Sequence, residues 1–242
     1  MISRVAISTK GLVKRYGRAK ALDGFTLDVP AGAVLGLVGP NGAGKTTWMM
    51  AVAGLLRIDA GEISVLGGGA FDASVHSGRL ALLPQDSELP LEMTPESLFL
   101  SFARLQGLSA AAAREAAEET LAAVNLTAHA RKSVRSLSHG MRKRVMAGQC
   151  FLGRPEVVLL DEPMNGLDPE EAERLRALIL AVRSDSRTIV ISSHNLLDLE
   201  RLCTHVAFVE AGRVTRVGTV AELTSGGRTL EDCYLSRRPT DG

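Results

Sequence analysis

The sequence predicts an α/β fold, in which a mostly parallel sheet lies beside an antiparallel β-subdomain and carries an inserted α-helical subdomain. A glycine-rich loop joins the apolar run Val34–Val38 to a segment with helical spacing, as in a strand–loop–helix unit. A second segment, Glu156–Leu160, is apolar after its first residue, as in a strand that is covered on both faces. Between the two runs, residues 94–145 carry the signals of helices.

Length and composition are those of an ordinary globular protein. The 242 residues suit one large domain or two small ones. We take residues 1–242 as a single domain, with the helical insert at about 87–147 and a polar C-terminal tail at about 236–242. The formal net charge of +1 favours neither nucleic acid nor a membrane surface as partner. No run approaches the length of a membrane span, and the three cysteines lack metal-site spacing, which favours reduced thiols.

Four short segments predict strands of a small antiparallel sheet beside the parallel core. Apolar and polar residues alternate at 2–9 and at 22–29, as in half-buried strands. Residues 62–66 predict another strand, and Leu80–Leu83 is a brief apolar run that Pro84 ends. We expect all four to pair within the antiparallel sheet.

Residues 39–47 form a loop suited to hold a phosphate chain. Glycines lack a Cβ, so the backbone can bring successive N–H groups against anionic oxygens. Lys45 can reach the β- and γ-phosphates, and the Thr46 hydroxyl is placed to ligate Mg²⁺. A helix that starts at Lys45 aims its positive end at the same phosphates. The predicted nucleotide-binding residues of the loop are Gly39, Pro40, Asn41, Gly42, Ala43, Gly44, Lys45, Thr46 and Thr47.

The helical insert has recognisable starts and stops. Thr94 caps a helix with proline in its first turn, and Gly107 ends it. Ser109 caps an alanine-rich stretch that runs to about Val124.

The parallel core resumes after the insert. Residues 170–183 form an amphipathic helix, residues 188–192 a strand and residues 195–202 a helix. The strands 206–210 and 213–217 flank an Ala-Gly turn, which is a hairpin signal.

Two adjacent carboxylates, Asp161 and Glu162, follow the strand that ends at Leu160. Successive residues at a strand end diverge, so the two acids can take different roles. Asp161 can hold Mg²⁺ through water, and Glu162 can orient and polarise an attacking water as general base. Strand ends also favour acids as turn caps, but a phosphate loop in the same chain favours the catalytic interpretation.

These motifs, in this order, resemble the nucleotide-binding subunit of an ATP-binding-cassette (ABC) transporter. The likeness runs from Tyr16 to about Gly218. It implies a P-loop NTPase core of the RecA-like type, ATP and Mg²⁺ as cofactors, and Mg²⁺-dependent ATP hydrolysis coupled to transport. It also implies a separate integral membrane permease, which would hold the chain in the cytoplasm at the inner face of the cell membrane.

The resemblance assigns roles to individual residues. Tyr16 matches the aromatic residue that stacks on adenine, and Gln85 the glutamine that links the γ-phosphate and Mg²⁺ to the membrane partner. His194 matches the switch histidine, and Asn165–Asp168 the loop that communicates across a dimer. The implied catalytic residues are Lys45, Gln85, Glu162 and His194, and the implied metal ligands are Thr46, Gln85 and Asp161.

The segment Leu137–Met141 occupies the place of the family signature, usually Leu-Ser-Gly-Gly-Gln. Ser138 is a good N-cap, and the helix after it can point its positive end at a γ-phosphate. In the family that phosphate belongs to ATP on a second cassette, so Ser138 and Gly140 are assigned to nucleotide binding across a head-to-tail dimer. His139 replaces a glycine of the signature, and this difference leaves the rate of ATP hydrolysis open. Met141 replaces the glutamine, and a methionine at this position resembles the signature of exporter-type cassettes. Whether the dimer is a homodimer or a heterodimer stays open.

The resemblance places the permease near Gln85 and the helical insert. Five apolar residues there either line a groove for a partner helix or fill the core of the insert, and the sequence leaves both open: Leu89, Leu91, Met93, Leu98 and Phe99.

Two other functions are kept as alternatives. One is a soluble cassette ATPase that acts on nucleic acid or ribosomes; such proteins usually carry two cassettes or long insertions, whereas this chain has one compact cassette, so we expect no nucleic-acid partner. The other is an ATP-gated clamp with little turnover, paired with a different cassette, which the altered signature motivates.

Overall fold

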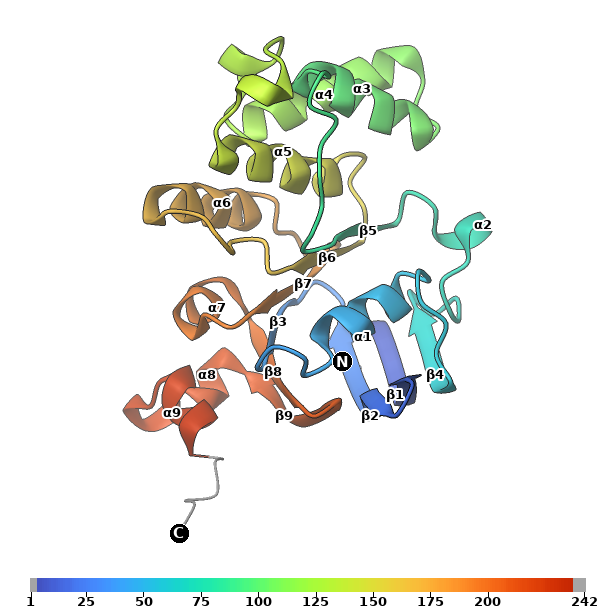
Figure 1. Cartoon of the computed structure of the whole chain (residues 1–242), viewed down its shortest axis with the longest axis vertical. Coiled ribbons are helices and arrows are strands. Elements are labelled where there is room, and N and C mark those ends of the chain that lie inside the picture. Colours follow the sequence, from blue (N-terminus) through green and yellow to red (C-terminus); the bar gives the residue numbers. More distant parts are fainter. Residues whose placement is uncertain (1–3, 237–242) are drawn as a thin grey trace.

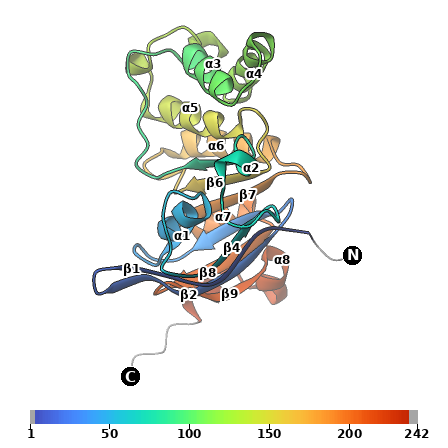
Figure 2. The same ribbon diagram turned by 90° about the vertical axis from the view of Figure 1, so that its right-hand side faces the viewer.

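The computed structural model describes residues 4–236, and two β-sheets form the centre of this part of the chain (Figures 1 and 2). The larger sheet has six strands there, in the order β5 (Leu80–Leu83), β6 (Val157–Asp161), β7 (Thr188–Ser193), β3 (Val34–Val38), β8 (His205–Glu210) and β9 (Arg213–Thr219). Neighbouring strands from β5 to β8 run parallel, and β9 forms an antiparallel hairpin with β8. The predicted parallel core and hairpin are confirmed.

The smaller sheet is antiparallel, as predicted, with the order β2 (Ala19–Pro30), β1 (Val5–Tyr16) and β4 (Ala60–Val65). The strands β1 and β2 are longer than expected because their pairing continues as far as Tyr16 and Ala19, across a tight turn at Gly17. Residues 2 and 3 of the strand predicted at 2–9 lie outside the described part.

The prediction that Leu80–Leu83 joins the antiparallel sheet was wrong. This segment is the edge strand β5 of the larger sheet, where Leu80 pairs in parallel with Val157. A run of four apolar residues carries no periodicity that would assign it to one sheet rather than the other. Because β5 and β6 are parallel neighbours, Gln85, which follows β5, lies beside the residues that follow β6.

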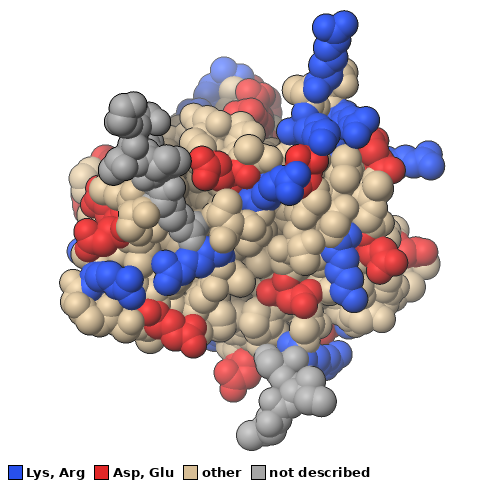
Figure 3. All heavy atoms as spheres, turned by 90° about the horizontal axis from the view of Figure 1, so that it is seen from below, with Lys and Arg blue, Asp and Glu red and all other residues tan. Residues whose placement is uncertain are grey.

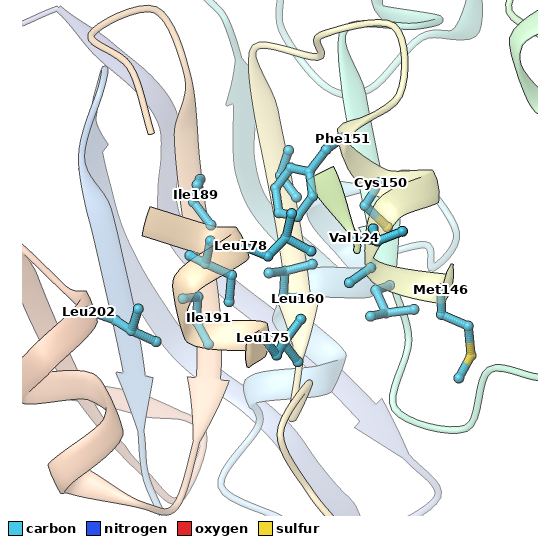
Figure 4. Close-up of a cluster of buried hydrophobic side chains, with 14 of the residues drawn as sticks. Val124, Met146, Cys150, Phe151, Leu160, Leu175, Leu178, Ile189, Ile191 and Leu202 are labelled. Carbon is cyan, nitrogen blue, oxygen red and sulfur yellow. The ribbon is translucent and has the colours of Figure 1, made fainter. Parts of the chain in front are cut away.

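The side chains of the larger sheet alternate between two cores. On one face, Leu35 and Leu37 of β3 pack with α1 (Lys45–Val52) and the smaller sheet, and Trp48 stacks on Phe25 with 5.8 Å between ring centroids. On the other face the strands meet α6 (Pro169–Ala181) and the helical insert. Figure 4 shows part of this second core, which includes Leu160, Leu175, Leu178, Ile189 and Ile191. Burial of these apolar surfaces on both faces holds the layers together.

Helices α3, α4 and α5 stack at one end of the molecule, beyond α6 (Figure 1). The predicted N-caps are confirmed: Thr94 accepts a hydrogen bond from the backbone of Ser97, and Ser109 from that of Ala112. The insert bounds of 87–147 remain a proposal, since α5 continues past residue 147. Bounds of the further helices are α2 (Ala73–His76), α3 (Pro95–Leu105), α4 (Ala110–Ala123), α5 (His139–Phe151), α7 (Leu196–Leu202), α8 (Val220–Leu223) and α9 (Leu230–Leu235).

The cysteines are buried free thiols, in agreement with the prediction: Cys150, Cys203 and Cys233. Burial raises the pKa of the Cys150 thiol to about 12. In residues 4–236, no helix is both long and apolar enough to cross a membrane. Most of the predicted polar tail, residues 237–242, lies outside the described part.

Candidate active site

A pocket of about 350 Å³ lies where the carboxyl ends of the parallel strands face the smaller sheet. Ligands of open α/β sheets bind at such strand ends. Its walls come from segments far apart in the sequence: Tyr16, Ala21, Asn41, Gly42, Ala43, Gly44, Lys45, Thr46, Thr47, Gln85 and Glu162.

The phosphate loop has a backbone that two glycines make possible. Gly44 has a φ of 109°, and a Cβ there would lie 2.5 Å from the carbonyl oxygen of Ala21. A Cβ at Gly39 would lie 2.2 Å from the carbonyl oxygen of Val209. Helix α1 begins directly after Gly44, so its free N–H groups end at the pocket. This loop can therefore present backbone donors to an anion.

Lys45 is folded back onto its own loop. Its Nζ donates to the carbonyl oxygens of Gly39 at 2.7 Å and Pro40 at 3.2 Å, and it lies 3.9 Å from Oε1 of Glu162. Burial lowers the pKa of the Lys45 ammonium, and the carboxylates of Glu162 and Asp161 oppose that shift. Gly39 and Pro40 do not line the pocket. Their carbonyl oxygens accept hydrogen bonds from the ammonium of Lys45, which does line the pocket.

The two acids at the end of β6, Asp161 and Glu162, diverge. Oδ1 of Asp161 accepts a short hydrogen bond from the Ser192 hydroxyl, and the same hydroxyl accepts from the backbone N–H of Glu162 at 2.8 Å. Glu162 has a φ of 47°, a left-handed conformation that is uncommon for a residue with a side chain. Its Oε2 lies 3.0 Å from Nδ1 of His194, which is largely exposed. The backbone turn at Glu162 thus aims its carboxylate into the pocket and toward His194.

Ser192 was missed by the sequence reasoning. It is fully buried on β7 beside β6 and joins the two acids through one hydroxyl. Only one feature of the sequence points to this role of Ser192, namely a hydroxyl side chain near the end of an apolar strand.

The oxygens suited to Mg²⁺ lie in the pocket and directly behind it, since Glu162 lines the pocket and Asp161 does not. Oδ2 of Asp161 and Oε1 of Glu162 are buried without a hydrogen-bond partner among the described residues. Thr46 and Gln85, which line the pocket, add a hydroxyl and an amide oxygen. This all-oxygen set fits a hard divalent cation that shares its coordination with phosphates and water. Within residues 4–236, no cluster of three or more His, Cys, Asp or Glu side chains offers a metal site made by the protein alone.

Tyr16 ends β1 at the rim of the pocket. Its ring is about half exposed, and the Lys14 ammonium lies 5.6 Å from the ring centroid. A base could stack on such an open aromatic surface.

The segment expected to bind nucleotide across a dimer lies elsewhere. Ser138 caps α5 by accepting from the backbone of Met141 at 3.2 Å, and neither Ser138 nor Gly140 lines the pocket. A Cβ at Gly140 would lie 2.4 Å from Cγ of Glu171 on α6. The structure therefore keeps Ser138 and Gly140 apart from the residues that it gathers around Lys45 and Glu162.

A buried ion pair between Arg144 on α5 and Glu171 on α6 joins the two helices near the N-terminus of α5. Nε of Arg144 lies 3.0 Å from Oε2 of Glu171, and Arg144 also donates to the carbonyl oxygen of Val124 at 2.6 Å. Arg144 is 3% exposed. The end of α5 is thus fixed relative to the loop 165–168 that precedes α6.

The five apolar residues near Gln85 divide between the two alternatives. Leu98 and Phe99 are buried in the core of the insert. Leu89 and Leu91 line a hollow of about 480 Å³ that also includes Gln85 and His139, and Leu89 packs against the core as well. Met93 packs partly buried against the core.

A model of the ABC transporter family matches residues 22–165, more than half of the chain. The chain belongs to the ABC transporter family. This cassette is 39% identical over 227 residues to the daunorubicin resistance ATP-binding protein DrrA3 of Streptomyces coeruleorubidus, covering 92% of the chain and 72% of that relative. It is 36% identical over 217 residues to the Nod factor export ATP-binding protein I of Burkholderia orbicola, covering 88% of the chain and 70% of that relative.

A solved structure described as an ATP-binding subunit of an ABC transporter has the same fold. The TM-score is 0.82 at 28% identity, with 96% of this chain and 98% of that chain covered. The cassette therefore has the P-loop NTPase fold predicted from the motifs, and the family makes it an ATP-binding and ATP-hydrolysing subunit of a transporter.

Proposed function

We propose that this cassette works as one half of an ATP-driven dimer, which powers export through a separate membrane permease. The observation that carries the proposal is the gathering of Lys45, Gln85 and Glu162 around one pocket, with His194 on the Glu162 carboxylate. Phosphoryl transfer needs little covalent chemistry from a protein, so catalysis rests on positioning and on charge.

Each residue has a role that its geometry supports. Tyr16 stacks on the base, and the backbone donors of residues 41–46 hold the phosphates. Glu162 takes the role of general base toward water, and His194 orients the Glu162 carboxylate and contacts the γ-phosphate.

The metal belongs to the same proposal. We assign its ligands to Thr46, Gln85 and, through water, Asp161. When bound, Mg²⁺ would neutralise charge on the phosphate oxygens.

Ser138 and Gly140 complete the site of a second copy. They lie outside this chain's own pocket, while Ser138 opens a helix whose N-terminus suits an anion. A dimer in which each α5 faces the partner's phosphate loop satisfies both observations. Loss of the γ-phosphate would remove the charge that joins the two halves.

The permease docks in our proposal on the hollow beside Gln85. Leu89 and Leu91 supply an apolar floor there, next to residues at the N-terminus of α5. The names of the relatives, drug resistance and Nod factor export, support outward transport and a location at the cytoplasmic face of the membrane.

The function is tested by expression together with any multi-span membrane protein that is encoded beside it. We expect a detergent-stable complex that contains two cassettes, and ATP-driven uptake of its substrate into inverted membrane vesicles. Recovery of the cassette on ribosomes or nucleic acid, with no membrane complex, contradicts the proposal and favours the soluble-ATPase alternative.

A further inference from the structure

A further cavity lies at the opposite end of the strands from the active site. It has a volume of about 440 Å³ and opens between α4 and α5 on one side and α6 with the turn at 184–187 on the other. Arg187 and Glu156, which line it, precede β7 and β6, whereas the active-site residues follow these strands. The cavity is therefore separate from the nucleotide pocket.

Arg187 is held rigidly in the wall of this cavity. Its Nε donates to the carbonyl oxygen of Pro155 at 3.1 Å, and its Nη1 to that of Val182 at 2.9 Å. Its guanidinium carbon lies 5.9 Å from the ring centroid of Phe151. In the described part of the chain Nη2 has no acceptor, so one arm of the guanidinium stays available.

The charge of Arg187 has no carboxylate partner within 4 Å among residues 4–236. The two glutamates that line the cavity are paired with other arginines: Glu119 with Arg154 at 3.3 Å, and Glu156 with Arg79 at 2.6 Å. Asp185, in the same turn as Arg187, does not line the cavity and forms no such pair there. Burial lowers the pKa of the Arg187 guanidinium, and the charge of Arg154 adds to this.

A half-buried guanidinium that no carboxylate balances gains more from a bound anion than a fully exposed one does. Arginine also matches carboxylate and phosphate groups geometrically. Phe151, Leu178 and Val124, which belong to the buried cluster in Figure 4, contribute apolar side chains to the lining of this cavity. Its size is that of sites for small organic molecules.

We propose that this cavity binds a small organic anion, whose carboxylate or phosphate pairs with Arg187 and whose apolar part lies against Phe151. Such a ligand touches the insert through α4 and α5 and the core through α6, so it ties the two together. Its binding is independent of the proposed export function, and only a resulting effect on ATP hydrolysis depends on it.

The test is a titration of the ¹⁵N-labelled cassette, followed by NMR, with benzoate, phenyl phosphate and neutral benzyl alcohol. Saturating ADP is present so that the phosphate loop is occupied. We expect either anion to shift the Arg187 Nε–H signal and the amides of Thr120 and Phe151 saturably, and benzyl alcohol to leave them unshifted. The anion that binds more tightly identifies the head group. Arg187→Gln should weaken binding at least about tenfold, whereas Arg183→Gln, an exposed arginine outside the cavity, should not.

A second variant keeps the test informative if Arg187→Gln fails to fold. Ala123 lines the cavity from the exposed end of α4, and Ala123→Phe fills it without removing a hydrogen bond of Arg187. This variant should also abolish the shifts. The proposal is overturned if benzyl alcohol shifts the signals as the anions do, if the anions shift only residues 39–47, or if Ala123→Phe binds as the wild type does.

Discussion

Nδ1 of His194 lies 3.0 Å from Oε2 of Glu162, although 32 positions separate the two residues. The contact exists because β6 and β7 are parallel neighbours, which brings the residues after both strands together. One carboxylate oxygen is thereby held by the histidine, and the other stays free of hydrogen bonds within the described residues. A general base needs this combination of fixed orientation and an available oxygen.

Replacement of Glu162 by glutamine should separate ATP binding from hydrolysis. Removal of a general base lowers turnover by at least about 100-fold, while Lys45 and the loop still hold the phosphates. Phosphate release and equilibrium ATP binding measure the two effects, and size-exclusion chromatography should show a dimer with ATP and a monomer with ADP. Glu173→Gln, on the exposed side of α6, serves as control and should behave as the wild type. Unchanged hydrolysis in Glu162→Gln would remove Glu162 from the mechanism.

A mixture of two inactive variants should regain activity if the site is shared between copies. Lys45→Ala removes the phosphate-binding charge and Ser138→Ala removes the group offered to the partner, so each homodimer has no intact site. In a mixed dimer one site combines an intact loop with an intact Ser138. With random pairing and independent sites we expect about a quarter of the wild-type ATPase rate. A mixture as inactive as its components would count against the face-to-back arrangement.

His194→Ala should reduce turnover more than it reduces ATP affinity. The imidazole contacts Glu162, and its proposed contact to ATP is limited to the γ-phosphate, while the loop holds the rest of the phosphate chain. We therefore expect turnover to fall about 10- to 100-fold, with the ATP dissociation constant changed by less than about threefold. His129→Ala, in the helical insert and outside the pocket, is the matched control. A loss of affinity with turnover unchanged would mean that His194 acts on binding alone.

The Arg144–Glu171 pair should stabilise the fold far more than exposed pairs do. Arg144→Ala leaves Glu171 largely buried with its other partner Arg174, and we expect a loss of about 3–5 kcal/mol in the free energy of unfolding. Arg131→Ala breaks an exposed pair with Glu96 and should cost less than about 1 kcal/mol. Urea unfolding followed by circular dichroism measures both. Similar losses in the two variants would contradict this ranking.

Alkaline pH should weaken the fold through Cys150. The thiol ionises near its ordinary pKa of 9.0 when unfolded but only at about 12 when folded, so the folded state keeps a proton that the unfolded state loses. Above pH 9 this contribution to stability therefore falls with rising pH, by about 1.4 kcal/mol per pH unit. Urea unfolding of the wild type and Cys150→Ala at pH 7 to 10.5 measures it. The advantage of the wild type should be constant below pH 8.5 and shrink above pH 9; a constant difference throughout would refute the assignment.

The sequence predicted the elements that are determined by residues close together in the chain. Helix caps such as Thr94, the strand before the phosphate loop and the hairpin of β8 and β9 follow from nearby residues, and they are confirmed. The sheet assignment of Leu80–Leu83 depends on a neighbour 77 positions away (Leu80 and Val157), and local pattern cannot supply it. The left-handed turn at Glu162 and its support by Ser192 also escaped prediction, because only tertiary contacts impose them.

The surface seen from below in Figure 3 carries interspersed lysine, arginine and acidic side chains and no extended area of one sign. This agrees with the near-neutral net charge of +1. Such a surface gives no electrostatic attraction to a polyanion on this side of the molecule.

The hydrogen bonds from Lys45 to the carbonyl oxygens of Gly39 and Pro40 hold its ammonium in place before a nucleotide binds. Two of the three ammonium protons already have carbonyl acceptors, so an incoming phosphate finds one free donor there. We expect a phosphate chain long enough to reach this donor to gain a charge-assisted hydrogen bond that a shorter chain, held only by the backbone donors of the loop, does not form.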